Sequence, residues 1–300
     1  MIFHEARIPG EVYGNWGKEA VLGVNTWGIP GLALSTFLVF IQAAILNPLF
    51  IKQSMIGEIN LYPGLCYILL TALHPAFIGF SSLLLANTTL MIALGYLFDI
   101  LKKERQEETR FMVGWWLAVS GLIYWPYLIL LLFGLISMSI LKTLKVKDIF
   151  QYMTGYLSPF LISWLVQIVL YEKIYPTFLQ AFDTFGIPSI GPIHNVADII
   201  VICIIGLLLL ISVLGYTQLI ARKNIHAQKK IDTLYAYIFF CVLMALFPLV
   251  ISVSFLMVLM VPLALFLAVF LRLIRHSAVA ESLHFILFVT AVICQILFVI

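Results

Sequence analysis

Residues 111–141, FMVGWWLAVSGLIYWPYLILLLFGLISMSIL, form an apolar run of 31 residues without one charged side chain. A single helix of this length would measure about 46 Å at about 1.5 Å per residue, whereas the hydrocarbon core of a bilayer is about 30 Å thick. A single crossing would also separate Lys142 from the basic residues that precede the run. We therefore predict a hairpin that turns at Trp125-Pro126-Tyr127, because proline lacks a backbone N–H and Trp and Tyr favour the membrane–water interface.

The composition of the chain explains this run. Hydrophobic residues make up 63% and charged residues 10% of its 300 residues, whereas about a quarter of the residues of soluble domains are charged. Apolar segments long enough to cross a bilayer recur along the chain. We therefore predict an all-α, polytopic integral membrane protein: an N-terminal interfacial segment at 1–28, without the apolar core of a signal peptide, and a single transmembrane domain at 29–300.

The basic residues are concentrated in short segments between the apolar runs. The positive-inside rule places such segments in the cytoplasm, so an even number of crossings joins each to the next. The net charge of +3 then reflects membrane insertion, and we expect no nucleic-acid partner. Thirteen of the 17 Lys and Arg residues lie in these segments, which are 102–110, 142–147, 221–230 and 272–276.

The requirement for an even number of crossings between basic segments also assigns most of the other spans. Residues 235–271 are too long for one crossing, so we expect a second hairpin that turns between Pro248 and Ser254. The remaining segments follow in chain order: a span at 150–172, an external loop at 173–198, a returning span at 199–220 and a last span at 281–300.

The first hundred residues allow two topologies. Residues 29–51 and 76–98 are each long enough to cross, but the 13 residues from Tyr62 to His74 are short and end at a His74-Pro75 break. A full crossing there gives ten spans with the N-terminus outside, whereas a half-helix that dips into the membrane gives nine with the N-terminus inside. Basic residues before the first span outnumber those after it, which favours an internal N-terminus.

Polar residues within apolar runs are the first candidates for function, because burying a charge in a membrane is costly. His74 either caps a turn at the interface or lines a polar pocket with three amides. Buried amides more often bond neighbouring helices, so we favour the structural interpretation. The amides are Gln42, Asn47 and Asn87, and the expected helix breaks are at Pro75, Pro126, Pro248 and Pro262.

The external loop is the other candidate region. A carboxylate and a histidine facing outward could act as general acid and base or bind a cation. Their spacing fits no metal signature, and neither does that of the four cysteines, so we predict no metal site and no cofactor. We favour a structured loop with an amphipathic segment at the interface. The loop and the two residues before it hold Glu172, Lys173, Asp183, His194 and Asp198.

Residues 45–101 resemble the front of an uncharacterised family of polytopic inner-membrane proteins from Bacteroidota, a domain of unknown function. The shared pattern is Asn47 at the end of the first span, then Leu61, Pro63 and Tyr67, then Leu85-Ala86-Asn87. The later stretches GWWLAVSGLIYWPYLILLLF and VPLALFLAVFLRLIRHSAVAESLHFILF also fit it. This resemblance implies a multi-pass protein of the bacterial inner membrane and carries no activity.

Residues 111–172 are also similar to the membrane region of polyprenyl-phosphate-sugar-dependent glycosyltransferases, in which short paired helices alternate with basic loops. That resemblance implies a polyprenyl-phosphate lipid as partner and an acidic residue in the first external loop. Glu58 stands there, with Asp183 or His194 as the residues that would assist it. The second acidic residue of the family's pair is missing.

Three functions are therefore weighed. We favour a non-catalytic membrane subunit that binds a membrane-protein partner in a cell-envelope machine for protein export, motility or envelope assembly. The alternative is a glycosyltransferase-like enzyme that uses Glu58. A transporter of a lipid or small hydrophobe would need inverted repeats, which we do not find. Function belongs to sites and not to folds, so the lack of a catalytic motif weighs more than the fold analogy.

Overall fold

The computed structural model describes residues 28–52, 61–101, 106–142, 144–171, 189–190, 196–215, 225–244, 250–251, 253–273 and 277–299. Apart from two paired two-residue strands, β1 (Ser189–Ile190) and β2 (Val250–Ile251), the elements in this part are helices. They are α2 (Ile29–Lys52), α3 (Tyr62–Thr71), α4 (Pro75–Ile78), α5 (Ser82–Asp99), α6 (Gln106–Ile123), η1 (Trp125–Ile129), α7 (Leu130–Leu141), α8 (Val146–Tyr171), α9 (Val196–Leu214), α11 (Ile225–Met244), η3 (Val253–Leu259), α12 (Met260–Leu273) and α13 (Ser277–Val299).

Five of these helical segments are long and apolar enough to cross a membrane, and three more are apolar but shorter. The helical fold predicted from the composition is therefore confirmed, with helices that could cross a membrane, whereas the number of spans, nine or ten, stays a prediction. The five are Ile29–Leu49, Ser82–Asp99, Val146–Val169, Val253–Leu271 and Ala280–Leu297, and the shorter three are Tyr62–Thr71, Trp125–Leu141 and Asp198–Leu214.

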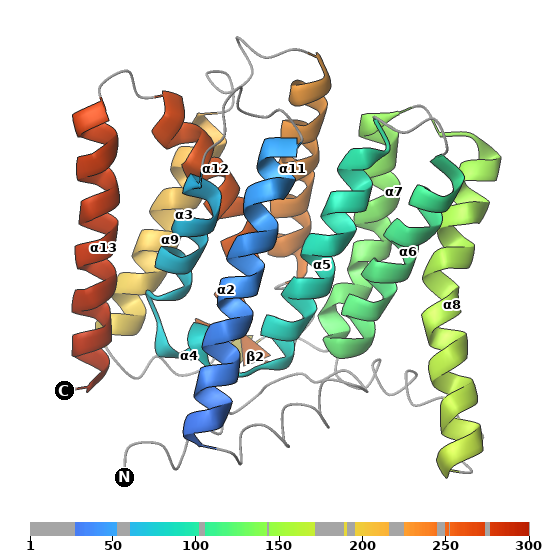
Figure 1. Ribbon diagram of the computed structural model, residues 1–300, viewed down its shortest axis with the longest axis horizontal. Helices are drawn as coiled ribbons and strands as arrows, with labels where there is room; N and C mark the ends of the chain where they lie inside the picture. Colours follow the sequence, from blue (N-terminus) through green and yellow to red (C-terminus); the bar gives the residue numbers. More distant parts are fainter. Residues whose placement is uncertain are drawn as a thin grey trace. The chain divides into compact units, whose positions relative to one another are not determined.

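The chain divides into two compact units. The first contains residues 80–189 and 236–251, and the second contains residues 29–79, 190–235 and 252–300. Helix α11 passes from the second unit into the first at Ala236. In the first unit, α5, α6, α7 and α8 lie side by side (Figure 1).

The hairpin in the long apolar run is present. Helix α6 ends at Ile123, the 3-10 helix η1 contains Pro126, and α7 ends at Leu141. Trp125 and Tyr127 are buried in the first unit, so neighbouring helices cover the turn residues, and their position at the water interface stays a prediction. The Tyr127 hydroxyl donates to Asn87 Oδ1 at 2.5 Å, so α5 covers the turn.

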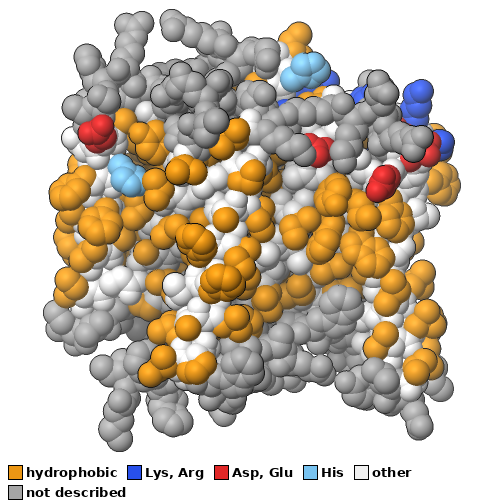
Figure 2. Space-filling model, in the orientation of Figure 1, with side chains coloured by type: hydrophobic (Ala, Val, Ile, Leu, Met, Phe, Trp, Pro, Cys, Tyr) orange, Lys and Arg blue, Asp and Glu red, His pale blue; other side chains and the backbone are white. Residues whose placement is uncertain are grey.

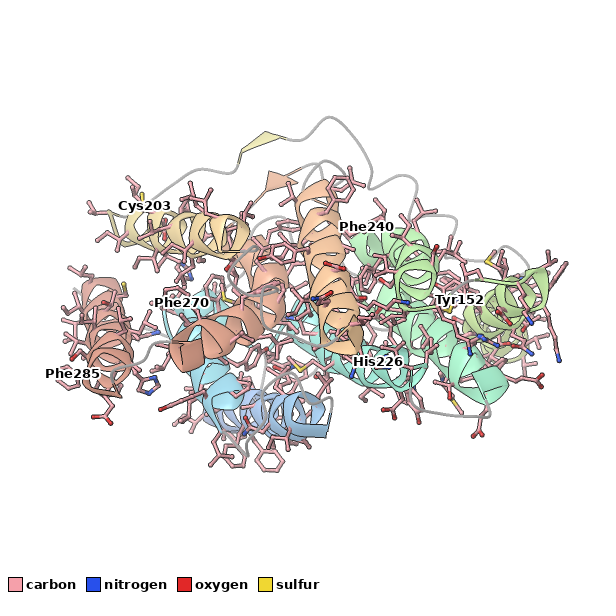
Figure 3. All side chains as sticks on the ribbon, turned by 90° about the horizontal axis from the view of Figure 1, so that it is seen from above. Tyr152, Cys203, His226, Phe240, Phe270 and Phe285 are labelled. Atoms are coloured by element: carbon pink, nitrogen blue, oxygen red, sulfur yellow. The ribbon has the colours of Figure 1, made fainter. Side chains whose placement is uncertain are left out.

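Helices α6 and α8 cross at two glycines. A Cβ atom on Gly155 would lie closer than 3.0 Å to the backbone oxygen of Phe111, and one on Gly114 would lie closer than 3.0 Å to that of Tyr152. Small residues allow such backbone-to-backbone approach between membrane helices. Tyr152 points into the space among α6, α7 and α8 (Figure 3) and donates to the Leu131 carbonyl at 2.9 Å.

Among the described residues of the first unit, the charged side chains lie at the end where α6 and α8 begin, and hydrophobic side chains cover the helices below them (Figure 2). Arg110 and Asp148 form a buried ion pair at 2.7 Å, and Lys147 pairs with Glu107 at the surface. Asp148 Oδ2 also accepts from the Lys145 backbone N–H at 3.0 Å. This last bond satisfies one of the donors left free at a helix N-terminus, so Asp148 fixes both the start of α8 and its contact with α6.

The second unit is built around α3 and α12, which contact each other, while α2, α9 and α13 pack against one or both of them. Helix α3 has 10 residues, about 15 Å at about 1.5 Å per residue, which is half of a bilayer core. Helix α13 is mostly exposed along its outer side, and Phe285 points away from the other helices of its unit (Figure 3).

The span predicted at 76–98 begins later than expected, because the helix that could cross runs from Ser82 to Asp99. Helix α4 ends at Ile78, and α5 begins at Ser82 after a break. Ser81 produces this second start, because its hydroxyl accepts from the Leu84 backbone N–H at 3.1 Å and replaces an intrahelical bond. Sequence hydropathy does not register such a break, because the residues around it stay apolar.

The second predicted hairpin has a break in the expected place, since α11 ends at Met244 and η3 begins at Val253. Pro248 lies outside the described residues. The basic segment at 221–230, predicted to connect two apolar runs, is helical in its second half, because Ile225 begins α11 and Lys230 is 2% exposed. An amphipathic first turn of a helix has the composition of a loop, which explains this difference.

The expected helix-breaking prolines behave differently from one another. Pro75 is the first residue of α4 and Pro126 lies in η1, both at breaks. Pro262 is the third residue of α12, just after the change from the 3-10 helix η3 to the α-helix, so the helical segment continues past it. Pro48 and Pro159 lie inside α2 and α8, which continue past them, as membrane helices tolerate.

Candidate functional site

The described residues hold one buried histidine–carboxylate pair, in the second unit. His74 lies at the break between α3 and α4, and Asp198 lies in the first turn of α9. His74 Nε2 is 3.0 Å from Asp198 Oδ1, although the two residues are 124 positions apart in the chain. The exposed fractions of His74 and Asp198 are 8% and 6%, so the contact is shielded from its surroundings.

The hydrogen bonds of His74 determine which ring nitrogen carries the proton. His74 Nδ1 accepts a hydrogen bond from the Ala76 backbone N–H at 3.0 Å, which caps α4. A nitrogen that accepts carries no proton, so the neutral ring has its proton on Nε2 and donates it to Asp198. Both ring nitrogens are therefore engaged within the protein.

Burial is the main influence on the charge of His74. Desolvation lowers the pKa of His74 below its ordinary value, and the hydrogen bond and charge of Asp198 oppose this shift without cancelling it. The ring, which lies between α3 and α4, is therefore neutral at pH 7. This agrees with the bonded geometry, in which a second proton on Nδ1 would break the cap of α4.

The surroundings of the pair are mostly apolar. The ring of Phe77 lies 5.2 Å from that of His74 in a tilted arrangement. Gln295 of α13 donates from Nε2 to the Ala72 carbonyl at 2.7 Å, which is one of the carbonyls left free where α3 ends. Three helices thus meet at one break, since α9 contributes Asp198, α13 contributes Gln295 and α3 leads into His74.

The predicted amides each bond a neighbouring helix. Gln42 Oε1 accepts from the Tyr67 hydroxyl at 2.6 Å, and Asn47 Oδ1 accepts from the Gly64 backbone N–H at 2.8 Å. Both bonds join α2 to α3. Asn87 accepts from Tyr127 in the other unit, so each of the four polar candidates has its own partner within its own unit.

The sequence pointed to His74 and to Asp198 but did not join them. The usable signal was present: a histidine at a helix break and an acid at the start of an apolar helix are rare in so apolar a chain. The candidates Glu58, Asp183 and His194 lie outside the described residues. Among the residues that the structure describes, no group of three His, Cys, Asp or Glu side chains could hold a metal ion.

No protein-family model matches the chain, and neither a curated protein nor a solved structure is detectably similar to it.

Proposed function

We propose that the protein is a non-catalytic integral membrane subunit of a cell-envelope complex. The observation that carries this proposal is the full engagement of His74. A catalytic imidazole uses one nitrogen for its carboxylate partner and keeps the other for the reacting group. Here the second nitrogen accepts from the Ala76 backbone N–H, so the pair serves to hold α4 and α9 together.

The amides support the same function. Gln42, Asn47 and Asn87 each accept a bond from a neighbouring helix or turn, which is the structural use of amides in membrane proteins. Each of these amides therefore has a structural role. A subunit whose work is to present a shaped membrane surface to a partner needs only such contacts.

The proposed setting is the bacterial inner membrane, with nine or ten spans and an internal N-terminus. The basic segments at 102–110, 142–147, 221–230 and 272–276 would face the cytoplasm by the positive-inside rule. In the first unit, the charged side chains of α6 and α8 lie at one end, as a cytoplasmic boundary requires.

The direct experiment is extraction of the tagged full-length protein in mild detergent, followed by mass spectrometry of the proteins and lipids that remain bound. We expect a stoichiometric membrane-protein partner. A polyprenyl-phosphate lipid without a protein partner would support the transferase instead.

The matching genetic experiment uses Glu58→Gln and His194→Ala in cells that depend on the protein. A subunit tolerates both changes, because neither residue carries out chemistry in it. Loss of function at a normal protein level in either variant would contradict the proposal. Gly206→Ala is the control, because a Cβ atom there meets nothing within 4 Å.

A further inference from the structure

We propose that His74 is an acid-sensitive switch: a proton on its second ring nitrogen releases α4, while the contact between His74 and Asp198 is kept. The switch consists of two hydrogen bonds made by one ring, one at each nitrogen. Nδ1 accepts from the Ala76 backbone N–H at 3.0 Å, and Nε2 lies 3.0 Å from Asp198 Oδ1. This inference rests on the structural role proposed for His74 and adds a regulation of that role.

The two bonds respond to a proton in opposite ways. Nδ1 can accept a hydrogen bond only while it is unprotonated. A proton taken from water at Nδ1 places an N–H group against the Ala76 N–H, and two donors cannot bond each other, so the cap of α4 is lost. The Nε2–H still donates to Asp198, and a bond between a cation and a carboxylate is stronger than a neutral one. His74 therefore stays attached to α9 when its bond to α4 is broken.

Helix α4 depends on this cap because it is short. It has four residues, Pro75–Ile78, and its backbone bonds run from the Phe77 N–H to the His74 carbonyl at 3.0 Å and from the Gly79 N–H to the Pro75 carbonyl at 3.1 Å. So short a helix is not stable by itself in water, because the first turn is costly to form. Phe77 is 0% exposed, so release of α4 also changes the packing of a buried aromatic ring.

One charged group faces His74 from the described elements around it, and this group is Asp198. Helices α2 and η3 pack on α4, and neither has a titratable side chain within residues 29–49 and 253–259. The thiols and phenols of α3, α9 and α13 are neutral near pH 7. They are Tyr62, Cys66, Tyr67, Cys203 and Cys294.

The other titratable groups of α13 are farther along that helix. Glu281 and His284 precede Gln295, the residue that bonds the end of α3, by 14 and 11 positions. These separations correspond to about 21 Å and about 16 Å along the helix axis. A titration at the α3–α4 break between about pH 5 and pH 7 therefore belongs to His74.

The predicted topology gives the side from which the proton arrives. Asp198 is the last residue of the predicted external loop at 173–198, so we expect the pair at the external side of the membrane. Acidification of that side would then release α4 at the break where α9 and α13 also make their bonds.

The test follows hydrogen–deuterium exchange of the detergent-solubilised full chain by mass spectrometry from about pH 7.5 to about pH 4.5, with exchange times scaled for the intrinsic rate at each pH. A peptide that covers residues 74–79 should exchange about fivefold faster below the transition, which is the effect of losing one helix cap. Peptides from the interiors of α3 and α9 should keep their protection. Equal protection of residues 74–79 at both ends of the pH range overturns the proposal.

Three variants assign the transition. His74→Asn keeps a side-chain acceptor at the start of α4 without a titratable ring, so residues 74–79 should stay protected at every pH. Asp198→Asn removes the negative charge beside the ring and should move the transition to lower pH. His284→Gln is the control, because it removes a histidine of the same unit that lies on α13, and it should leave the transition unchanged. A transition that persists in His74→Asn, or that is lost in His284→Gln, overturns the proposal.

The wild-type protein provides a second measurement that does not rely on the folding of a variant. In protein labelled with nitrogen-15 in its histidine rings, NMR reports which ring nitrogens carry a proton. One ring should hold its proton on Nε2 alone at neutral pH and take a second proton on Nδ1 at the midpoint of the exchange transition. The proposal is wrong if no histidine ring takes a second proton at that midpoint.

The switch and the proposed function can fail separately. Capture of a membrane-protein partner tests the subunit role, whereas exchange at residues 74–79 reads only the release of α4. A pH transition without a captured partner would leave the switch in place and remove the subunit. A captured partner without the transition would remove the switch alone.

Discussion

The two units hold their helices together in different ways. In the first unit, α6 and α8 meet backbone to backbone at Gly114 and Gly155, without a polar side chain between them at that point. In the second unit, α4 and α9 are joined by the buried pair of His74 and Asp198. Lipid removes most of the hydrophobic drive for helix association, which leaves close packing and hydrogen bonding. At these two contacts the units rely on different contributions, although the Arg110–Asp148 ion pair also joins α6 to α8 and Gly64 also lies close to the backbone of α2.

This difference has a consequence for tolerance to mutation. A backbone crossing has no room for one additional carbon atom, whereas a hydrogen-bonded pair fails when either partner is removed. We expect the α6–α8 crossing to be sensitive to added volume and the His74–Asp198 contact to be sensitive to lost polarity.

The largest expected effect is at the glycine crossing. Gly155→Ala forces a Cβ atom against the Phe111 carbonyl, which is backbone and cannot rotate away. We expect the free energy of unfolding to fall by about 3 kcal/mol, measured by denaturation in mixed detergent micelles. The same change at Gly206 of α9, where a Cβ atom meets nothing within 4 Å, should leave stability unchanged or raise it slightly. Equal effects at the two glycines would contradict a close backbone crossing at Gly155.

A smaller loss is expected when the buried pair is broken. Asp198→Ala leaves the His74 Nε2–H without its acceptor and should cost about 2 kcal/mol of unfolding free energy. Asp198→Asn keeps an acceptor oxygen and should cost less. If the asparagine variant is as unstable as the alanine variant, the charge of Asp198 matters and not its hydrogen bond.

The third prediction applies one substitution to both units. Tyr127→Phe removes the donor to Asn87, and Tyr67→Phe removes the donor to Gln42. Both hydroxyls are buried, so each change should cost about 1 kcal/mol. Similar losses are expected, because both units use a tyrosine–amide bond in the same way. A loss confined to one unit would show that the two bonds are not equivalent.

The smallest effect should come from pH. The pKa of His74 is lowered in the folded protein, so the unfolded chain binds a proton more readily than the folded chain. The contribution of the neutral His74 to the free energy of unfolding is therefore complete above about pH 6.5, the ordinary pKa of histidine. This contribution decreases as the pH falls below that value. Thermal unfolding in detergent at several pH values tests this, with His74→Gln as the variant that should lose this pH dependence. A wild-type protein that is more stable at pH 5 than at pH 7 would contradict this prediction.

The sequence predicted the features that depend on local chemistry. The break at Pro126 follows from a missing N–H within one residue, and the apolar helices follow from hydropathy. His74 was singled out because histidines are rare in apolar runs. Each of these signals is contained in a short window, which is why they survived comparison with the structure.

The features that depend on distant residues were not predictable in the same way. Asp198 is 124 positions from His74, and nothing local to either residue selects the other. The α6–α8 crossing needs one glycine from each of two helices, and neither glycine alone differs from others in the chain. Lys230 is buried because it lies on the side of α11 that faces its unit. The composition around Lys230 resembles that of a loop, so the sequence alone does not reveal this.

The most direct test of the account is a double-mutant cycle on His74 and Asp198. Unfolding free energies are measured in detergent for the wild type, His74→Ala, Asp198→Ala and the double variant. We expect a coupling energy of about 2 kcal/mol, because the two side chains are hydrogen-bonded to each other and connect α4 to α9. Absence of coupling, together with loss of cellular function in stable single variants, would contradict it and make the pair a site of chemistry.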